Sequence, residues 1–363
     1  MSTAADMQAV MCHAPRDYRL ERAPRPQAGP NELVIEITAC GICASDCKCH
    51  SGAAMFWGGN GQPAWVKAPV SPGHEFFGRV AVLGPGAAEH FGVSLGERVI
   101  AEQIVPCERC RYCRSGKYWM CEVHNIFGFQ REVADGGMAQ YMRIPSTALV
   151  HKIPVDMSLE DAAIIEPLSC AIHAVTRGDI QLDDVVVIAG AGPIGLMMVQ
   201  VARLKTPRKL VVIDMVPQRL ELARRYGADV VINPRDENAP AIVRALTNGY
   251  GCDVYIEATG SPSGAVQGLE LVRKLGRFVE FSVFGHDTTA DWSIIGDRKE
   301  LDIRGAHLGP YCYPIAIDLL ARGFVTSKGI VTHDYPLERW DEAIAIANSL
   351  DSIKVLMKPA PST

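Results

Sequence analysis

Four cysteines lie close together at a spacing that is typical of a metal site, Cys107-x-x-Cys110-x-x-Cys113-x7-Cys121. A thiolate is a soft, charged donor, and four thiolates complete a tetrahedral shell around Zn²⁺. Because such a shell leaves no open position, the motif predicts a structural metal rather than a catalytic one. Unrelated surface cysteines and an iron–sulfur cluster are the alternative interpretations of this pattern.

A second set of possible metal ligands is spread over the chain: Cys43 in Gly-Ile-Cys-Ala-Ser-Asp, His74 and Glu75 in Pro-Gly-His-Glu-Phe, and Glu166 before Pro167. A thiolate, an imidazole and a carboxylate would hold zinc and leave one position open. An alcohol on such an ion loses its proton more easily and can then release hydride to a nicotinamide. Singly, each residue has an ordinary explanation as a buried thiol, a polar turn or a helix cap.

Four cysteines crowd into ten residues, at Cys40, Cys43, Cys47 and Cys49. An all-sulfur metal site and a redox pair are both possible for this cluster. Since His74 and the carboxylates need a thiolate partner, we expect Cys43 to be the ligand and the other three to be packing thiols.

A dinucleotide fingerprint runs from Gly190 to Gly195, with the sequence Gly190-Ala-Gly192-Pro193-Ile194-Gly195. It follows the apolar run Val185–Ala189 and opens a helix, so the glycines would allow a tight turn and close approach of a pyrophosphate. The helix N-terminus favours phosphate. Asp214, after the next strand, would bind ribose hydroxyls and favour NAD over NADP, while Arg219 could soften that preference.

The elements around these motifs predict two kinds of domain. Short β-branched runs separated by turns dominate the N-terminal part of the chain and predict short strands. The glycines within residues 84–96 predict a loop there. Strands then alternate with helices, including an expected helix over 263–275, which indicates a doubly wound parallel sheet. Near the C-terminus we expect a helix over 337–350. The predicted fold class is α/β, with domains over 1–160 and 161–300, and residues 301–363 returning to the first domain.

Composition excludes several classes of protein. The 363 residues carry a net charge of −5 and are 48% hydrophobic, which argues against nucleic-acid and membrane-surface binding. The N-terminus lacks the pattern of a secretory signal, and glycines interrupt the longest apolar stretch. The 12 cysteines are spaced like metal ligands, so we expect a reducing, cytoplasmic location rather than disulfides.

Together, these motifs resemble the zinc-dependent medium-chain dehydrogenase/reductase family over nearly the whole chain, and Glu166-Pro167 resembles its polyol and threonine branch. Segments 48–65, 292–295 and 305–312 resemble dehydrogenases of four-carbon polyols such as erythritol and L-threitol. The resemblance implies a GroES-like catalytic domain, a Rossmann domain and a homotetramer or homodimer. It also implies one catalytic and one structural zinc, with either Glu75 or Glu166 binding the catalytic ion directly.

In this family Ser45 would relay the proton of the alcohol. The chain departs from polyol dehydrogenases at Lys48, where they commonly carry histidine; lysine is a poorer proton shuttle near neutral pH. His50 is a candidate for the exit route, whereas Lys48 could contact a substrate hydroxyl or lie in solvent. Five aromatic residues are either core residues or residues that narrow the site: Phe56, Trp57, Trp65, Phe127 and Trp292.

The sequence therefore predicts an NAD- and zinc-dependent oxidation of a secondary alcohol on a short, erythritol- or L-threitol-like polyol to a ketose. Other substrates remain open, namely sorbitol, xylitol, L-threonine or a simple alcohol. A protein of another class, a sensor or structural module that binds zinc and NAD without turnover, is a further alternative. The intact set of catalytic groups argues against it.

Overall fold

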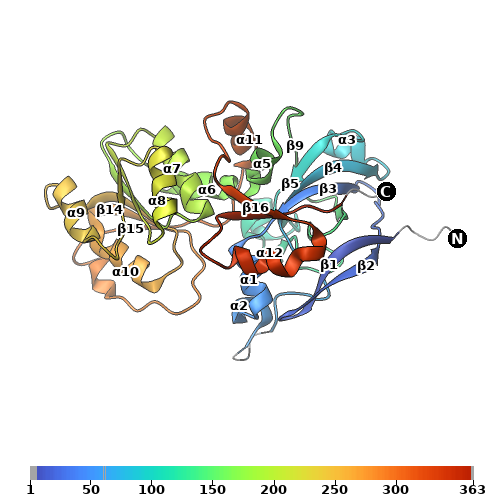
Figure 1. Cartoon of the computed structure of the whole chain (residues 1–363), viewed down its shortest axis with the longest axis horizontal. Helices are drawn as coiled ribbons and strands as arrows, with labels where there is room; N and C mark the ends of the chain where they lie inside the picture. Colours follow the sequence, from blue (N-terminus) through green and yellow to red (C-terminus); the bar gives the residue numbers. More distant parts are fainter. Residues whose placement is uncertain (1–5, 60, 62, 361–363) are drawn as a thin grey trace. The chain divides into compact units, whose positions relative to one another are not determined.

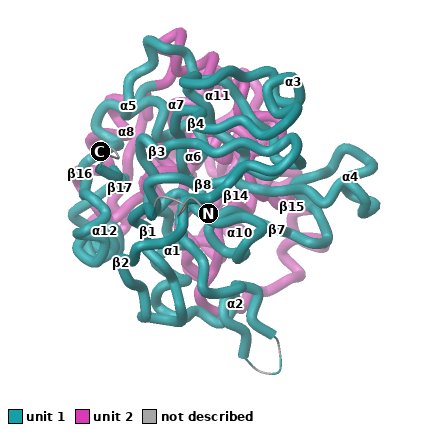
Figure 2. Tube along the Cα trace, turned by 90° about the vertical axis from the view of Figure 1, so that its right-hand side faces the viewer, with its two compact units in different colours: residues 1–166, 326–363 teal, residues 167–325 magenta. Residues whose placement is uncertain are grey.

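The computed structural model describes residues 6–59, 61 and 63–360, and the chain forms two compact units (Figure 2). Unit 1 comprises Met1–Glu166 and Thr326–Thr363, and unit 2 comprises Pro167–Val325. The boundaries differ from the expected 160/161 and 300/301. Residues 301–325 stay with unit 2 because β15 (Asp302–Gly305) pairs in parallel with β14 (Val272–Glu280).

Unit 2 is built on a six-stranded parallel sheet with the order β12-β11-β10-β13-β14-β15. Counted along the chain, this is the 3-2-1-4-5-6 order of a doubly wound sheet. The other strands are β10 (Val185–Ala189), β11 (Lys209–Ile213), β12 (Val230–Ile232) and β13 (Cys252–Glu257). The helices are α6 (Ile165–Arg177, across the unit boundary), α7 (Pro193–Leu204), α8 (Pro217–Arg225), α9 (Ala239–Leu246), α10 (Pro262–Leu271), α11 (Tyr313–Ala321) and the 3₁₀ turn η2 (Trp292–Ile294) (Figure 1).

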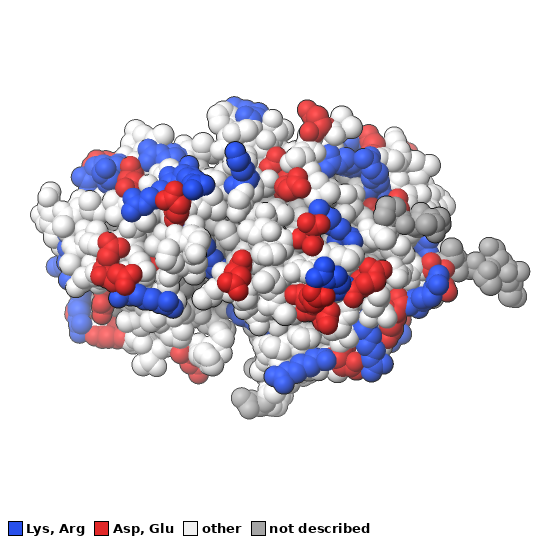
Figure 3. Space-filling view, viewed as in Figure 1, with Lys and Arg blue, Asp and Glu red and all other residues white. Residues whose placement is uncertain are grey.

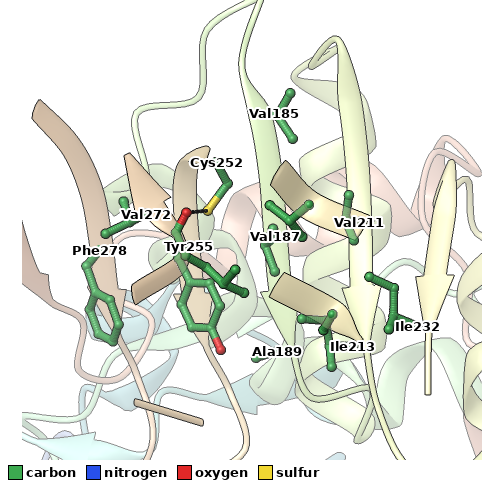
Figure 4. Packing of buried hydrophobic residues seen from close by; sticks show 13 residues of the cluster. Val185, Val187, Ala189, Val211, Ile213, Ile232, Cys252, Tyr255, Val272 and Phe278 are labelled. Carbon is green, nitrogen blue, oxygen red and sulfur yellow. Dashed lines mark hydrogen bonds between the residues drawn. The ribbon is translucent and has the colours of Figure 1, made fainter. Parts of the chain in front are cut away.

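Both faces of this sheet are covered. Alternate residues of β10, Val185, Val187 and Ala189, join a buried cluster with β11, β13 and the helices α9 and α10 (Figure 4). The intervening Val186 and Ile188 are also fully buried, and α7 packs on β10 and β11. Since side chains alternate along a strand, burial on both faces accounts for the continuous apolar run.

Unit 1 holds a seven-stranded sheet with the order β16-β17-β3-β4-β5-β9, in which β8 also pairs with β3. Its strands are β3 (Leu33–Gly41), β4 (Glu75–Leu83), β5 (Arg98–Ala101), β8 (Tyr141–Ile144), β9 (Val150–Lys152), β16 (Val331–Tyr335) and β17 (Lys354–Met357). Two further pairs are β1 (Asp6–Ala14) with β2 (Asp17–Pro24), and β6 (Ile104–Val105) with β7 (Asn125–Ile126). The helices are α1 (Ala44–Ser51), α2 (Ala54–Trp57), α3 (Ala87–Phe91), α4 (Arg111–Arg114), α5 (Leu159–Ala163), α12 (Trp340–Ala347) and the 3₁₀ turns η1 (Tyr118–Met120) and η3 (Leu337–Arg339).

The C-terminal strand β17 lies beside β3 in the sheet of unit 1. β17 runs antiparallel to β3, with Leu356 opposite Gly41 and Met357 opposite Cys40. β3 in turn pairs with β4, where Gly41 lies opposite Glu75. This pairing brings three distant segments of the chain together directly before α1.

Three expected elements need correction. The loop over 84–96 contains the short helix α3, which begins after Gly86. The helix expected over 263–275 ends at Leu271, because Val272 already pairs with Cys252 in the sheet. The helix expected over 337–350 is divided into η3 and α12 and ends at Ala347.

Acidic and basic side chains are interspersed over the face seen in Figure 3, without one large field of a single sign. This distribution agrees with the small net charge of −5. Within the described ranges, no helix is long and apolar enough to cross a membrane.

Candidate functional site

Cys43 lies at the N-cap of α1, where a buried carboxylate fixes the backbone. Its N–H donates to Asp46 Oδ2 over 2.8 Å, and Asp46 is fully buried. Because Asp46 is the third residue of the helix, this contact is one half of a capping box. Cys43 therefore sits at the N-terminus of α1, with its backbone fixed by the helix itself.

His74 and Glu75 enter the site from the start of β4. Gly73 before them has a φ of +95°, and a Cβ there would lie 2.5 Å from Cys40 Sγ, so the turn requires glycine. One ligand atom each of Cys43, His74 and Glu75 lies within 4.8 Å of the others. The structure thus brings together three of the four residues predicted to bind the catalytic metal.

The imidazole of His74 is held between a hydroxyl and a carboxylate. Its Nε2 lies 3.5 Å from Ser45 Oγ, and its Nδ1 lies 3.7 Å from Asp46 Oδ1. Burial lowers the pKa of His74, but the charges of Asp46, Cys43 and Glu166 outweigh it and raise the pKa well above its usual value. A carboxylate behind a histidine is the usual arrangement that orients a metal-binding imidazole.

Glu75 also makes a buried ion pair with the C-terminal strand. Lys354 Nζ lies 2.7 Å and 2.5 Å from the two carboxylate oxygens and also donates to Ile42 O over 3.2 Å. Only 3% of Lys354 is exposed. Burial lowers the pKa of Lys354, but the negative charges of Glu75, Cys43 and Glu166 reverse the effect and raise it.

Glu166 lies outside the close group of Cys43, His74 and Glu75. Its Oε1 accepts a hydrogen bond of 2.7 Å from the buried Gln103 side chain. Its charge nevertheless helps to raise the pKa of both His74 and Lys354, which places the carboxylate near the same site. The structure therefore holds the two candidate carboxylates by different partners, an ammonium and an amide.

The donor set suits zinc. A thiolate, an imidazole and a carboxylate form a three-ligand set of the kind that leaves a position for water or substrate. His74 and Glu75 are buried, whereas Cys43 and Ser45 are partly exposed, so the site opens on their side. His74 Nδ1 and Asp46 Oδ1 are buried and 3.7 Å apart, too far for a hydrogen bond, and neither atom has a hydrogen-bond partner among the described residues.

The three other cysteines of the crowded segment do not join this group among the described residues. Cys40, Cys47 and Cys49 are buried. Burial raises the pKa of Cys47 to about 12 and that of Cys40 well above its usual value. Both thiols therefore carry their protons near neutral pH, which favours packing over ligation.

The four-cysteine lobe forms the second candidate metal site. Ligand atoms of Cys107, Cys110, Cys113 and Cys121 lie within 4.8 Å of one another. Backbone N–H groups point at the sulfurs, including that of Cys113 at 3.5 Å from Cys110 Sγ. N–H groups of Cys113 and Glu122 lower the pKa of Cys110 to about 6, which favours the thiolate that a metal requires.

The predicted dinucleotide turn lies between β10 and α7. A Cβ on Gly195 would lie 1.9 Å from Gly190 O, and one on Gly190 would meet Ala258 O, so both positions require glycine. A Cβ on Gly192 would meet nothing within 4 Å, so its backbone faces open space. Gly192 is the N-cap of α7, and Pro193, Ile194 and Gly195 form its first turn.

Asp214 follows β11 beside this turn. Its Oδ2 accepts a hydrogen bond of 2.6 Å from Ala191 N, and its Oδ1 accepts one of 2.8 Å from Val216 N. The carboxylate is therefore fixed at the carboxyl end of the strand, where ribose hydroxyls bind in this fold. Arg219, on the first turn of α8, is partly buried.

Sequence reasoning assigned no role to four residues that the structure places beside the candidate metal site. They are Asp46, Gln103, Phe129 and Lys354. Asp46 had a local signal, since an acidic residue three positions after a helix cap fits a capping box. Lys354 had none, because it pairs with a residue 279 positions earlier.

Comparison with known proteins identifies the family. A model of the alcohol dehydrogenase GroES-like domain matches residues 29–155, and a model of zinc-binding dehydrogenases matches residues 193–322. The erythritol/L-threitol dehydrogenase of Mycolicibacterium smegmatis is 51% identical over 98% of each chain. The chain belongs to the zinc-binding alcohol dehydrogenase family. Its first unit is thus GroES-like, as the sequence resemblance predicted.

Other members agree on the class of reaction. A sorbitol dehydrogenase of Halalkalibacterium halodurans is 33% identical over 96% of this chain and 97% of its own. A crystal structure described as a zinc-binding dehydrogenase from Sinorhizobium meliloti, bound to NADP, superposes with a TM-score of 0.87 at 27% identity, over 98% of this chain and 100% of that one. The protein is an enzyme, a dehydrogenase of the polyol branch that uses a nicotinamide dinucleotide.

Proposed function

We propose that the enzyme oxidises a secondary alcohol of a four-carbon polyol, erythritol or L-threitol, to the corresponding ketose with NAD as hydride acceptor. The convergence of Cys43, His74 and Glu75 within 4.8 Å carries the chemical part of this proposal. The 51% identity to an erythritol/L-threitol dehydrogenase supports the substrate. We also propose a homotetramer or homodimer, which light scattering would test.

Zinc held by Cys43, His74 and either Glu75 or Glu166 would supply a Lewis acid that makes the substrate hydroxyl more acidic. The carboxylate of Asp46, 3.7 Å from His74 Nδ1, would orient the imidazole by its charge, and Lys354 holds the carboxylate of Glu75 in place. Both contacts preorganise the site before substrate arrives. The second zinc, on the four cysteines of the lobe, would have a structural role.

Ser45 is the group that handles the proton. Its hydroxyl is partly exposed, and Oγ lies 3.5 Å from His74 Nε2, at the open side of the ligand set. From there it can accept the proton of the substrate hydroxyl while donating its own to solvent water, as a general acid–base relay requires. Bound NAD would supply the hydride acceptor that turns the secondary alcohol into a ketone.

Asp214 supports NAD rather than NADP as the cofactor. Both carboxylate oxygens of Asp214 are fixed by backbone N–H groups, so the negative charge cannot turn away from a ribose 2′-phosphate. Repulsion between the two anions therefore disfavours NADP. Arg219 could reduce this repulsion, so we expect some activity with NADP as well, at a lower kcat/KM than with NAD.

NADH formation should be measured with erythritol, L-threitol, D-threitol, sorbitol, xylitol and L-threonine, each with and without a zinc chelator. The proposal expects chelator-sensitive activity that is strongest on a four-carbon polyol. Cys43→Ser and His74→Ala should abolish turnover and leave NAD binding intact. Normal turnover in either variant would refute the zinc assignment, and a preference for sorbitol or threonine would refute the substrate.

A further inference from the structure

An aromatic cluster lies directly against the candidate zinc ligand His74. The Phe129 ring lies 5.6 Å from the imidazole, centroid to centroid. Phe129 is also stacked on Phe56 at 5.3 Å and packs against Trp65 at 5.1 Å. We call Phe56, Trp65 and Phe129 the aromatic wall.

Backbone hydrogen bonds hold the wall in one geometry. The N–H groups of Trp65 and Val66 donate to Phe56 O over 2.9 Å and 3.0 Å. Lys67 N donates to Phe129 O over 2.9 Å, and the Gln130 side chain donates to Trp65 O over 2.9 Å. Two segments that are far apart in sequence are thereby fixed to each other, so the backbone that carries the three rings is held in place.

Exposure increases along the wall away from the imidazole. Phe129 and Phe56 are 3% and 5% exposed, whereas Trp65 is partly exposed. Cys43 and Ser45 are the partly exposed members of the candidate metal site. A substrate that reaches the site from its open side and extends past His74 would therefore meet apolar rings.

We propose that the aromatic wall limits the length of the polyol that the enzyme oxidises. This inference rests on the polyol dehydrogenase activity proposed above. Carbons beyond the short chain would place their hydroxyls against Phe129 and Trp65, where the ring faces offer no conventional hydrogen-bond partner. Each hydroxyl that loses its hydrogen bonds to water without replacement should weaken kcat/KM by about tenfold to hundredfold.

The test compares kcat/KM for erythritol, xylitol and sorbitol in the wild type and in Trp65→Ala. Removal of the indole should raise the xylitol/erythritol and sorbitol/erythritol ratios by about tenfold or more. Trp57→Ala is the matched control, because Trp57 is another partly exposed indole of the same segment whose Nε1 donates to Cys49 O outside the wall. Its ratios should equal those of the wild type.

Phe129→Leu provides a second variant if Trp65→Ala does not fold. It keeps an apolar side chain but removes the ring beside His74 and leaves a smaller group, so the same ratios should rise. Unchanged ratios in both folded, zinc-containing variants would overturn the inference, as would a wild type that prefers sorbitol. A wild type that oxidises no polyol would instead refute the proposed function itself, which is visible before any variant is made.

Discussion

Lys354 gives the sharpest test of how the site is built. Its ammonium group is the direct partner of both Glu75 oxygens, at 2.7 Å and 2.5 Å, and both side chains are almost fully buried. Lys354→Met keeps most of the side-chain volume and removes the charge. Glu75 is then left as a buried carboxylate without its counter-ion.

The expected loss of stability in Lys354→Met follows from the burial of the ion pair. Removal of one partner of a buried ion pair costs roughly 3–5 kcal/mol, because the remaining charge stays desolvated. For a unit of about 200 residues, 1 kcal/mol shifts the melting temperature by about 2–4 °C, so unit 1 should melt roughly 6–20 °C lower. Zinc beside Glu75 would offset part of the loss, so the shift should be larger after chelation.

Thermal unfolding of zinc-loaded and chelator-treated protein, followed by circular dichroism, measures this shift. Lys358→Met is the matched control, because Lys358 forms a partly exposed ion pair of 3.0 Å with Asp334 in the same unit. Such a pair contributes about 1 kcal/mol or less. A second substitution, Glu75→Gln in the Lys354→Met background, should recover most of the stability. The reasoning fails if Lys354→Met and Lys358→Met melt at the same temperature.

Four further predictions concern other parts of the enzyme. Asp214→Ser should raise the NADP/NAD ratio of kcat/KM by about tenfold to hundredfold, because the charge that repels a 2′-phosphate is gone; an unchanged ratio in steady-state kinetics would exclude Asp214 as the ribose ligand. Gly195→Ala should abolish dinucleotide binding in a fluorescence titration, since the new Cβ would lie 1.9 Å from Gly190 O; wild-type affinity would show that the turn adapts. Cys110→Ser should remove one of two zinc ions per chain, measured by atomic emission, and lower the melting temperature; two retained ions would contradict a four-cysteine site. Lys48→His should extend activity to lower pH, because imidazole exchanges protons near neutrality; an unchanged pH profile would place Lys48 off the proton path.

The parallel-sheet unit was largely predictable because its signals are local. The apolar run Val185–Ala189 has the same bounds as strand β10. The error at the end of α10 has a tertiary cause. Cys252 pairs with Val272 and Val254 with Arg277, so a bulge inserts extra residues in β14, with Leu275 at a φ of +56°. Helix propensity alone could not reveal that pairing.

The candidate metal site was predictable only in part, because some of its residues are brought together by strand pairing between distant segments of the chain. The types and order of Cys43, His74 and Glu75 already suggested a ligand set, and the fold brings their ligand atoms together. Lys354 became part of the site only because β17 pairs with β3, a contact between segments more than 300 residues apart. No local pattern in the C-terminal segment marks a lysine that will be buried beside a carboxylate.

The two carboxylates of the site differ in how firmly they are held, and this bears on which one can leave its partner. Glu75 is closer to Cys43 and His74, yet it is bound to the ammonium of Lys354, and separating a buried ion pair is costly. Glu166 is bound to the neutral amide of Gln103, and a hydrogen bond from an amide to a carboxylate contributes only about 1.5–3 kcal/mol. If the carboxylates exchange during turnover, Glu166 is the one that can move at lower cost. Gln103→Leu should therefore change turnover more than zinc content, whereas Lys354→Met should change stability first.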